Sequence, residues 1–304
     1  MAMKYHAGEI AVQRKAGVRR QADRLAAGIR GVMSPDRAEY VVEQRFAVLG
    51  TVDRRGYVWA SVVTGKAGFI QALDERTIRI AAAPAAGDPL AENLARAGHA
   101  AVIVPDLALR RRLRLNGTGR IAGGIIEIRA EQIYGNCSHY IQSRAPVGER
   151  QWKTGDAGAV RASELSSEHQ RLIASADTLF IATDDPDTGA PESGADVSHR
   201  GGNPGFVRAV SSRRLAIPDY AGNNMFNTLG NIAVNPRVGL LFISFESGRT
   251  LQLSGRAAID WDKARAATLA GAARIIDFEL DETVDNTHGF PLLYEFHEYS
   301  HFNP

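Results

Sequence analysis

Several short patterns in the sequence combine residue types that could do chemistry. His297-Glu298-Tyr299-Ser300-His301 matches the H-E-x-x-H pattern of zinc peptidases, in which two histidines on one helical face bind the metal and the glutamate acts as general base. The pattern follows Pro291 closely, and no candidate for a third ligand comes after it. His288 upstream is only a loose candidate, so the sequence does not predict a metal site.

Other patterns point to further chemistries that the sequence context does not support. The single cysteine, Cys137, is of a type that is more often a small buried residue than a nucleophile, and a pocket-lining or packing role is expected for it and for Tyr140. Gly117-Thr118-Gly119 follows a strand-like segment, but alternation over residues 125–133 predicts another strand instead of the helix that a dinucleotide loop requires. The run from Arg110 to Arg114 lacks the stacking aromatics of a nucleic-acid surface.

Composition sets the class of protein. The 304 residues are 44% apolar and 23% charged, with a net charge of +2, which is typical of globular proteins and excludes disordered, collagen-like and coiled-coil chains. One cysteine excludes an intrachain disulfide and fits a reducing compartment. Residues 1–25 lack the apolar core of a signal peptide, and the apolar run at 238–243 is too short to cross a membrane. We expect a cytoplasmic protein with no membrane or nucleic-acid partner.

An internal repeat organises the chain. Three segments recur in order at separations of 134 to 138 residues: Phe46 with Phe180, Gly68-Phe69-Ile70 with Gly205-Phe206-Val207, and Leu113 to Gly117 with Leu251 to Gly255. A period of this size indicates a duplicated domain and not a solenoid repeat. We expect N-terminal helices and one copy in residues 1–147, a linker at 148–162 that is rich in glycine and polar residues, and a second copy with a C-terminal tail in residues 163–304.

Each copy has the pattern of short antiparallel strands. Polar and apolar residues alternate at 58–63, 112–115 and 250–253, as in strands with one buried face, and Asp/Gly turns separate the strands, as in a barrel or a sandwich. Helix starts are expected at Ser34-Pro35, at Asp88-Pro89 and at Asn227. A capping box of Ser167 and Gln170 predicts one more.

Two regions of the second copy, with supporting segments elsewhere, carry a resemblance to a known family. They read SHRGGNPGFV at 198–207 and IPDYAGNNMFNTLGN at 217–231, and the supporting segments are NPR at 235–237, LLF at 240–242, RTLQLSG at 249–255, YGNC at 134–137, YIQ at 140–142 with Arg144, and SHFNP at 300–304. Together they resemble the pyridoxamine 5'-phosphate oxidase-like, FMN-binding split-barrel family, in particular its double-barrel branch. The resemblance covers nearly the whole chain and implies two tandem split β-barrels with flanking helices, an α+β fold.

The resemblance places the flavin phosphate on the loop that follows the strand at 217–220. The residues it assigns to cofactor binding there are Asp219, Tyr220, Gly222, Asn223, Asn224, Asn227 and Thr228. Amide and hydroxyl donors at a helix start suit a phosphate dianion. The arginine or lysine usual in the family is absent from this loop, so Arg200 or Arg249 is expected to supply the charge. The alternative is a loop that simply turns the chain.

The flavin ring is expected between the two copies. His199, Arg200 and Gln252 are the groups expected near it. The first copy has alanines at 82, 83, 85 and 86, where the second has its polar loop, so one FMN per chain is expected. Arg111 and Arg112, with Arg114, Trp59, Thr64 and Lys66, are candidates for the facing wall. The alternative for the arginines is a solvated strand face.

The resemblance implies a flavin-dependent oxidoreductase that acts on a small molecule. A nicotinamide cofactor or a partner reductase, including one of the ferredoxin type, would reduce the flavin, and a homodimer is a further expectation. No residue is assigned a catalytic role. Three alternatives stay open: a flavin carrier or sensor without turnover, a haem-binding or haem-degrading split barrel, and a protein that binds F420 or FAD in place of FMN.

Overall fold

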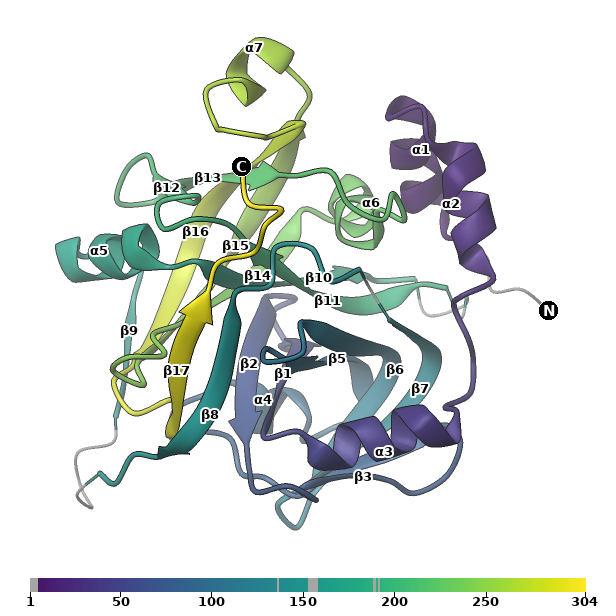
Figure 1. Cartoon of the computed structure of the whole chain (residues 1–304), viewed down its shortest axis with the longest axis vertical. Helices are drawn as coiled ribbons and strands as arrows, with labels where there is room; N and C mark the ends of the chain where they lie inside the picture. The colour runs from purple at the N-terminus through teal and green to yellow at the C-terminus, as the bar shows by residue number, and fades with distance from the viewer. Residues whose placement is uncertain (1–4, 136, 153–157, 188–189, 191) are drawn as a thin grey trace.

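The two halves of the chain fold into antiparallel sheets with the same strand order (Figure 1). The computed structural model describes residues 5–135, 137–152, 158–187, 190 and 192–304. The first sheet has the order β2-β1-β5-β6-β7-β4-β3, from β1 (Phe46–Val52), β2 (Val58–Thr64), β3 (Ile70–Ala72), β4 (Thr77–Ile80), β5 (Gly98–Asp106), β6 (Arg111–Ala122) and β7 (Ile125–Gly135).

The second sheet repeats this arrangement. Its order is β11-β10-β14-β15-β16-β13-β12, from β10 (Thr178–Asp185), β11 (Gly194–Gly201), β12 (Arg208–Ala209), β13 (Arg214–Asp219), β14 (Arg237–Ile243), β15 (Thr250–Asp260) and β16 (Arg274–Asn286). Each strand of the first sheet therefore has a counterpart in the second. The predicted pair of tandem split β-barrels is confirmed.

Helices and three further strands complete the fold. The helices are α1 (Ala7–Lys15), α2 (Arg19–Ala26), α3 (Pro35–Glu43), α4 (Leu90–Asn93), α5 (Ser167–Ser175), α6 (Asn227–Val234) and α7 (Lys263–Ala266). The strands β8 (Ser143–Glu149) and β17 (Leu292–Glu298) pair with each other, and β9 (Ala159–Ala162) pairs with β16. None of the helices in the described residues is long and apolar enough to cross a membrane.

A matching β-bulge shows how closely the two copies correspond. The register of β6 against β7 shifts between Asn116 and Gly117, and that of β15 against β16 shifts between Ser254 and Gly255, 138 residues later. A Cβ atom at either glycine would lie 2.1 Å from a backbone oxygen of the neighbouring strand. Both bulges therefore require glycine.

The strand register corrects one part of the sequence alignment. Val48 pairs with Ile103 in β5, and Phe180 pairs with Leu241 in β14, so Val48, and not Phe46, is the counterpart of Phe180. The separation at this strand is 132 residues instead of 134. A slip of two residues leaves the same side chains on the same face of a strand, so an alternating pattern cannot detect it.

The three largest apolar cores of the described residues hold the molecule together. One lies inside each barrel, with Phe69 and Leu115 in the first and Phe206 and Leu253 in the second. The third core joins the barrels and contains side chains from both, among them Phe46, Val48, Phe180 and Leu241. The rings of Phe46 and Phe180 pack edge to face with centroids 6.4 Å apart. The two barrels therefore form one continuous packed body.

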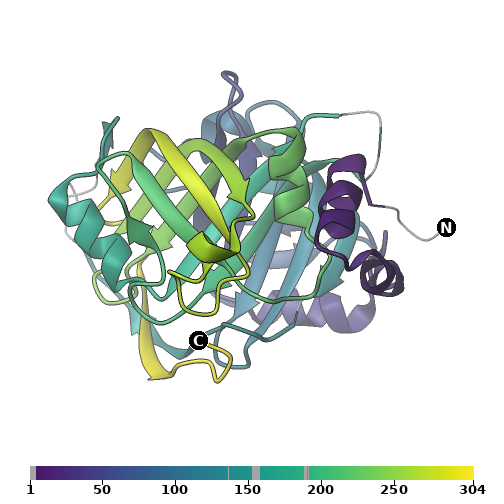
Figure 2. The same cartoon turned by 90° about the horizontal axis from the view of Figure 1, so that it is seen from above.

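The connection between the barrels differs from a simple linker. Within residues 148–162, the structure has the end of β8 and the whole of β9, and residues 153–157 lie outside the described part. The strand β17 near the end of the chain pairs with β8 from before this connection. The capping box of α5 is formed by Ser166 and His169, one residue earlier than expected. Sequence analysis expected N-terminal helices but did not assign the bounds of α1 and α2; α1 packs beside α6 (Figure 2).

Candidate functional site

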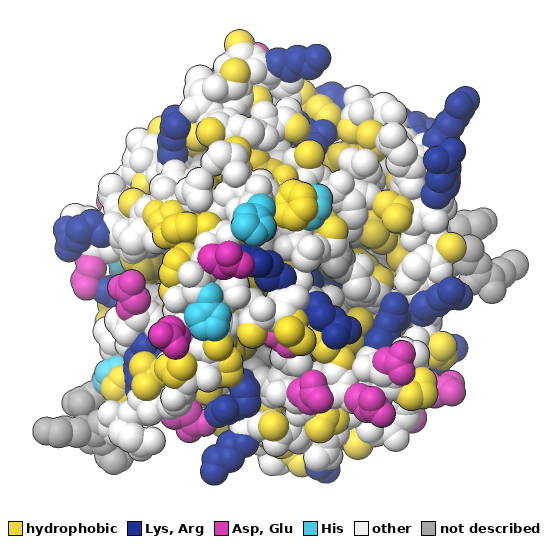
Figure 3. All heavy atoms as spheres, in the orientation of Figure 1, with side chains coloured by type: hydrophobic (Ala, Val, Ile, Leu, Met, Phe, Trp, Pro, Cys, Tyr) yellow, Lys and Arg dark blue, Asp and Glu magenta, His cyan; other side chains and the backbone are white. Residues whose placement is uncertain are grey.

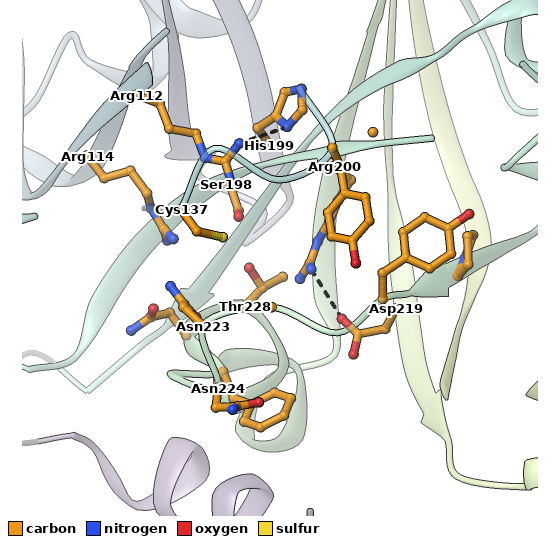
Figure 4. A pocket seen from close by; sticks show the side chains of 17 residues that line it. Arg112, Arg114, Cys137, Ser198, His199, Arg200, Asp219, Asn223, Asn224 and Thr228 are labelled. Atoms are coloured by element: carbon orange, nitrogen blue, oxygen red, sulfur yellow. Dashed lines mark hydrogen bonds and ion pairs between the residues drawn. The ribbon is translucent and has the colours of Figure 1, made fainter. Parts of the chain in front are cut away.

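A pocket lies between the two barrels, where β6 of the first faces β11, β13 and the loop before α6 of the second (Figure 4). The space among its lining residues is about 760 Å³, which includes space open to solvent. The lining residues are Arg112, Arg114, Cys137, Tyr140, Ser198, His199, Arg200, Gly201, Pro218, Asp219, Tyr220, Gly222, Asn223, Asn224, Phe226, Asn227 and Thr228.

The loop before α6 has an unusual backbone that shapes one wall of the pocket. Asn224 and Phe226 both adopt left-handed conformations, with φ of 60° and 61°, which only a few per cent of residues other than glycine do. The Asn223 Oδ1 atom accepts a hydrogen bond of 3.0 Å from the Met225 backbone N–H. These turns bring the start of α6 to the pocket.

Asp219, at the end of β13, holds two arginines beside the pocket. Its side chain is 3% exposed and lies 3.2 Å from Nη1 of Arg200 and 2.9 Å from Nη2 of Arg274. The Arg200 guanidinium is therefore oriented by a buried carboxylate. Its Nε atom is buried and has no hydrogen-bond partner within the described residues.

Asp196, in β11, connects the two barrels below the pocket. One oxygen contacts Arg114 of β6 and accepts hydrogen bonds of 3.2 Å from the hydroxyl of Tyr134 and from the amide of Asn116. The other accepts a hydrogen bond of 3.2 Å from the Thr228 hydroxyl. The first three partners come from the first barrel, and Thr228 comes from α6 of the second.

His199 is a neutral side chain with a defined tautomer. Burial, and the charges of Arg112, Arg200 and Arg144, lower the pKa of His199 well below its ordinary value. Its Nδ1 atom lies 3.3 Å from Nη1 of Arg112. Because a guanidinium can only donate, Nδ1 accepts and the proton resides on Nε2. That buried N–H has no partner among the described residues.

The pocket carries more positive than negative charge. Arg114 and Arg200 each contact an aspartate, but no ion pair joins Arg112 to a carboxylate in the part of the chain that the structure describes. Burial is the main cause that lowers the pKa of Arg112 to about 10, so it remains protonated at neutral pH. A free guanidinium and unpartnered N–H groups are suited to an anionic group such as a phosphate.

Aromatic side chains also line the pocket. The rings of Tyr140 and Tyr220 lie 5.1 Å apart, and the Tyr140 hydroxyl donates a hydrogen bond of 2.9 Å to the carbonyl of Ala221. Phe226 also lines the pocket. The pocket thus combines cationic and aromatic side chains, which suit a phosphate attached to a planar ring system.

Ten of the thirteen residues expected at the site line this pocket. They are Arg112, His199, Arg200, Asp219, Tyr220, Gly222, Asn223, Asn224, Asn227 and Thr228. Two of the loop side chains that were expected to donate to a phosphate already donate to carboxyl groups, which sequence reasoning did not foresee. Asn227 donates to Glu9 and Thr228 donates to Asp196, so these side chains shape the loop in place of offering free donors.

The other three expected residues lie elsewhere. Arg249 forms ion pairs with Glu168 and Asp285, Gln252 donates to the carbonyl of Ala60 and to the Ser61 hydroxyl, and Arg111 lies over the Tyr40 ring. None of the three lines the pocket. The charge expected from Arg249 is instead available from Arg112, which no carboxylate neutralises within the described residues.

The strand correspondence explains the error for Gln252. Ile103 pairs with Arg114 in the first barrel and Leu241 pairs with Gln252 in the second, so Gln252 is the counterpart of Arg114. Because the barrels face each other, β6 of the first barrel lines the pocket of the second. The equivalent strand β15 carries Gln252 and faces the first copy. Trp59, Thr64 and Lys66, also expected on the facing wall, lie outside the pocket.

The corresponding place in the first barrel is filled. Apolar residues occupy the counterpart positions: Val62 for His199, Val63 for Arg200, Ala82 for Asp219 and Leu90 for Thr228. Asp88 accepts a hydrogen bond of 2.7 Å from Ser61, which accepts one from Gln252. β9 also covers this place, since a Cβ atom at Gly87 would lie 2.5 Å from that of Ala159.

Sequence reasoning missed the contribution of the N-terminal helix to the site. Glu9 of α1 accepts hydrogen bonds from the Asn227 side chain and from the His6 backbone, and Gln13 donates one of 2.8 Å to the Met225 carbonyl. α1 thus fixes both the loop and the start of α6. The buried residues of α1 include Glu9 and Gln13, so the helix has no apolar stripe that would have revealed it.

The buried carboxyl of Glu9 should make stability depend on pH. Burial raises the pKa of Glu9 from 4.5 to about 8, so the folded protein keeps a proton that the unfolded chain has lost. The free energy of unfolding should therefore fall as pH rises, by about 1–2 kcal/mol between pH 6.5 and 8. Urea unfolding at the two pH values measures this.

The Glu9→Gln variant isolates this effect. A hydrogen bond to Asp184 raises the pKa of His99, so His99 also makes the free energy of unfolding fall as pH rises. The wild-type protein alone therefore does not show which of the two residues causes the fall. Asp88, whose burial raises its pKa to about 6, changes protonation mostly at lower pH. The fall should be smaller in Glu9→Gln, and an equal fall in both proteins would show that Glu9 is not its source.

The H-E-x-x-H pattern does not form a metal site. His297 and Glu298 lie in the strand β17, and His301 is in a turn after it, so the two histidines are not on one helical face. Among the residues that the structure describes, no group of three or more His, Cys, Asp or Glu side chains could hold a metal ion.

Several solved structures are similar to parts of this chain. HupZ from Group A Streptococcus is 13% identical, with 42% of this chain and 98% of that chain covered and a TM-score of 0.33. A putative pyridoxamine 5'-phosphate oxidase from Lactobacillus delbrueckii is 16% identical, with 40% and 94% covered and a TM-score of 0.32. An FAD-binding protein from Mesorhizobium loti is 12% identical, with 42% and 96% covered and a TM-score of 0.29.

Likeness at this level carries no argument about function. No curated protein matches the chain. A family model does: the one described as pyridoxamine 5'-phosphate oxidase matches residues 33–160 and again residues 165–285. The two matches follow the two barrels and together cover most of the sequence. The chain therefore belongs to the pyridoxamine 5'-phosphate oxidase family, with two tandem copies of its domain.

Proposed function

We propose that the protein binds one FMN in the pocket between its barrels and acts as a flavin-dependent oxidoreductase on a small molecule. The observation that carries the proposal is the unpaired cation Arg112 beside the unpartnered N–H groups of His199 and Arg200, in a pocket that also has aromatic walls. Family membership is consistent with a flavin, and the donor set fits its phosphate.

The chain's own residues would hold the two parts of the cofactor. Arg112, Arg200 and the His199 Nε2–H are the candidates to donate to anionic oxygens, while Tyr140, Tyr220 and Phe226 surround apolar space suited to a ring. When bound, a flavin supplies the redox chemistry, and the protein's part is binding, orientation and exclusion of water. Asp219 holds Arg200 in place for this role.

The tautomer of His199 argues against haem as the cofactor. An axial histidine binds iron through an unprotonated nitrogen, and its other ring nitrogen usually donates to an acceptor. In this site the Nδ1 atom faces the donor Arg112 and the proton is on Nε2. His199 is therefore set to donate a hydrogen bond and not to ligate a metal.

The expected result of a binding test is a flavin spectrum and a single site. Titration with FMN should give one FMN per chain, because the corresponding place in the first barrel is apolar and filled. The Arg112→Met variant should bind FMN about tenfold or more weakly, since one charge-assisted hydrogen bond contributes about 1.5–3 kcal/mol. Quenching of flavin fluorescence measures both quantities.

Arg111→Met is the matched control, because Arg111 is the adjacent residue of β6 but does not line this pocket. Its FMN affinity should equal that of the wild type. Riboflavin, which lacks the phosphate, should bind wild type and Arg112→Met almost equally. Two equivalent FMN per chain, or equal losses in both arginine variants, would overturn the proposed site. F420 and FAD are tested in the same assay.

Turnover separates the proposed oxidoreductase from a flavin carrier or sensor. Our proposal includes a cytoplasmic location, which the single cysteine supports, and a nicotinamide cofactor or a partner reductase as electron donor. Stopped-flow measurements of the bound flavin mixed with NADPH, with and without a ferredoxin-type reductase, show whether either donor reduces it. Bound flavin that neither donor reduces would favour a carrier or sensor.

A further inference from the structure

A second pocket lies beside the first and shares one wall with it. The space among its lining residues is about 830 Å³, including space open to solvent, and the pocket is formed by the start of α3, the start of β6, the last residue of β7 and Ser138. The residues that line it are Ser34, Asp36, Arg37, Tyr40, Arg110, Arg111, Arg112, Leu113, Gly135 and Ser138. Arg112 lines both pockets, and Cys137 of the first is adjacent in sequence to Ser138 of the second.

Four arginines line this second pocket, and only one of them is neutralised. Arg110 pairs with Glu298 at 2.9 Å. Over the residues for which the structure gives positions, no ion pair joins Arg37, Arg111 or Arg112 to a carboxylate. Asp36 is the one carboxylate in the lining. Several Lys and Arg side chains gather on this face of the molecule (Figure 3).

Neutral contacts hold the uncompensated guanidinium groups in place. Arg37 donates a hydrogen bond of 3.1 Å to the carbonyl of Ile133, and Arg111 lies over the Tyr40 ring, 5.2 Å from its centroid. Partial burial and the charge of Arg30, which does not line the pocket, lower the pKa of Arg37. Oriented cations that no carboxylate neutralises gain stability when an anion binds among them.

We propose that this second pocket binds the diphosphate group of a dinucleotide, the ligand class that includes the nicotinamide cofactors. The guanidinium groups of Arg37 and Arg111, together with Arg112 on the wall shared with the first pocket, provide more charge than a single phosphate needs, and the pocket has room for more than a phosphate. The position next to the proposed flavin pocket would bring the rest of such a ligand to the redox site. The choice of dinucleotide rests on the proposed function, whereas binding of a diphosphate does not.

The test uses the purified full-length chain without flavin and ADP-ribose as the probe, because ADP-ribose carries a diphosphate but cannot reduce a flavin. Calorimetric titration should show one site. The Arg37→Met and Arg111→Met variants should each bind ADP-ribose about tenfold or more weakly and keep wild-type affinity for FMN. Arg120→Met is the control, since Arg120 is exposed, pairs with Glu127 and lies on the same strand; it should bind ADP-ribose as the wild type does.

The proposal would be overturned if ADP-ribose did not bind, if all variants bound it equally, or if ADP-ribose and FMN competed for one site. Pyrophosphate should compete with ADP-ribose, and inorganic phosphate should do so at least tenfold more weakly. Equal competition by phosphate would also overturn it, in favour of a simple phosphate site. Because FMN binding is measured separately, failure here is distinct from failure of the proposed flavin site.

Discussion

The Asp196→Asn variant is expected to lose about 3–5 kcal/mol of its free energy of unfolding, because it leaves the Arg114 guanidinium buried without a counter-charge. Arg114 and Asp196 are each 3% exposed at the side chain. The same carboxylate also accepts hydrogen bonds from Tyr134, Asn116 and Thr228. Urea unfolding at pH 7 measures the loss.

A double variant shows whether the charge itself is the cause. In Asp196→Asn with Arg114→Gln both charges are removed, and most of the lost stability should return, since a neutral pair leaves no buried ion. Glutamine is the natural choice because Gln252 occupies the corresponding position of the other barrel. An exposed pair on the same sheet, Arg120 with Glu127, should change stability by less than about 1 kcal/mol. A near-neutral Asp196→Asn would contradict the role of the network.

The second large effect is expected in the barrel cores. Phe206→Ala should lower the free energy of unfolding by about 3–5 kcal/mol, the range for truncating a buried phenylalanine. Phe206 is 7% exposed and packs in the core of the second barrel. Phe69, its counterpart, has the same exposure in the first core. Urea unfolding should therefore show a similar loss for Phe69→Ala.

The neighbouring glycines support this correspondence. A Cβ atom at Gly65 would lie 2.5 Å from Cβ of Phe69, and one at Gly202 would lie 2.7 Å from Cβ of Phe206. Each phenylalanine thus packs directly against a glycine four residues earlier. Val210→Ala, at a side chain that is 63% exposed, is the control and should change stability by at most about 0.5 kcal/mol. A loss below about 1 kcal/mol for Phe206→Ala would contradict the assignment.

The fold could be predicted from the sequence to the extent that local patterns determine it. Alternating strands, the repeated Gly-Phe-apolar segment and the Asn227 helix start all depend on neighbours along the chain. The two-residue slip at Phe46 escaped detection because both alignments place the same faces inward. α1 escaped because it buries the polar side chains of Glu9 and Gln13, which a search for apolar stripes passes over.

The site was predicted in part for a related reason. The loop at 222–228 lies within one barrel, and its polar residues could be recognised there. The charged wall comes from the other barrel, so assigning Arg112 and Arg114 to the pocket, and excluding Arg249 and Gln252, requires knowledge of how the barrels dock. That docking depends on the shared core and on close backbone approaches such as Gly239 against Trp59, which no local pattern reveals.

Because both barrels belong to one polypeptide, their sequences can differ, whereas those of two identical chains cannot. In such a pair, every substitution appears twice and changes both symmetry-related sites together. Here Arg114 and Gln252, or His199 and Val62, occupy corresponding places yet are encoded separately, so each can vary alone. The place that corresponds to Val62 could thus be closed while the pocket that contains His199 kept its polar lining. A substitution in that pocket changes one site and leaves the other as it was.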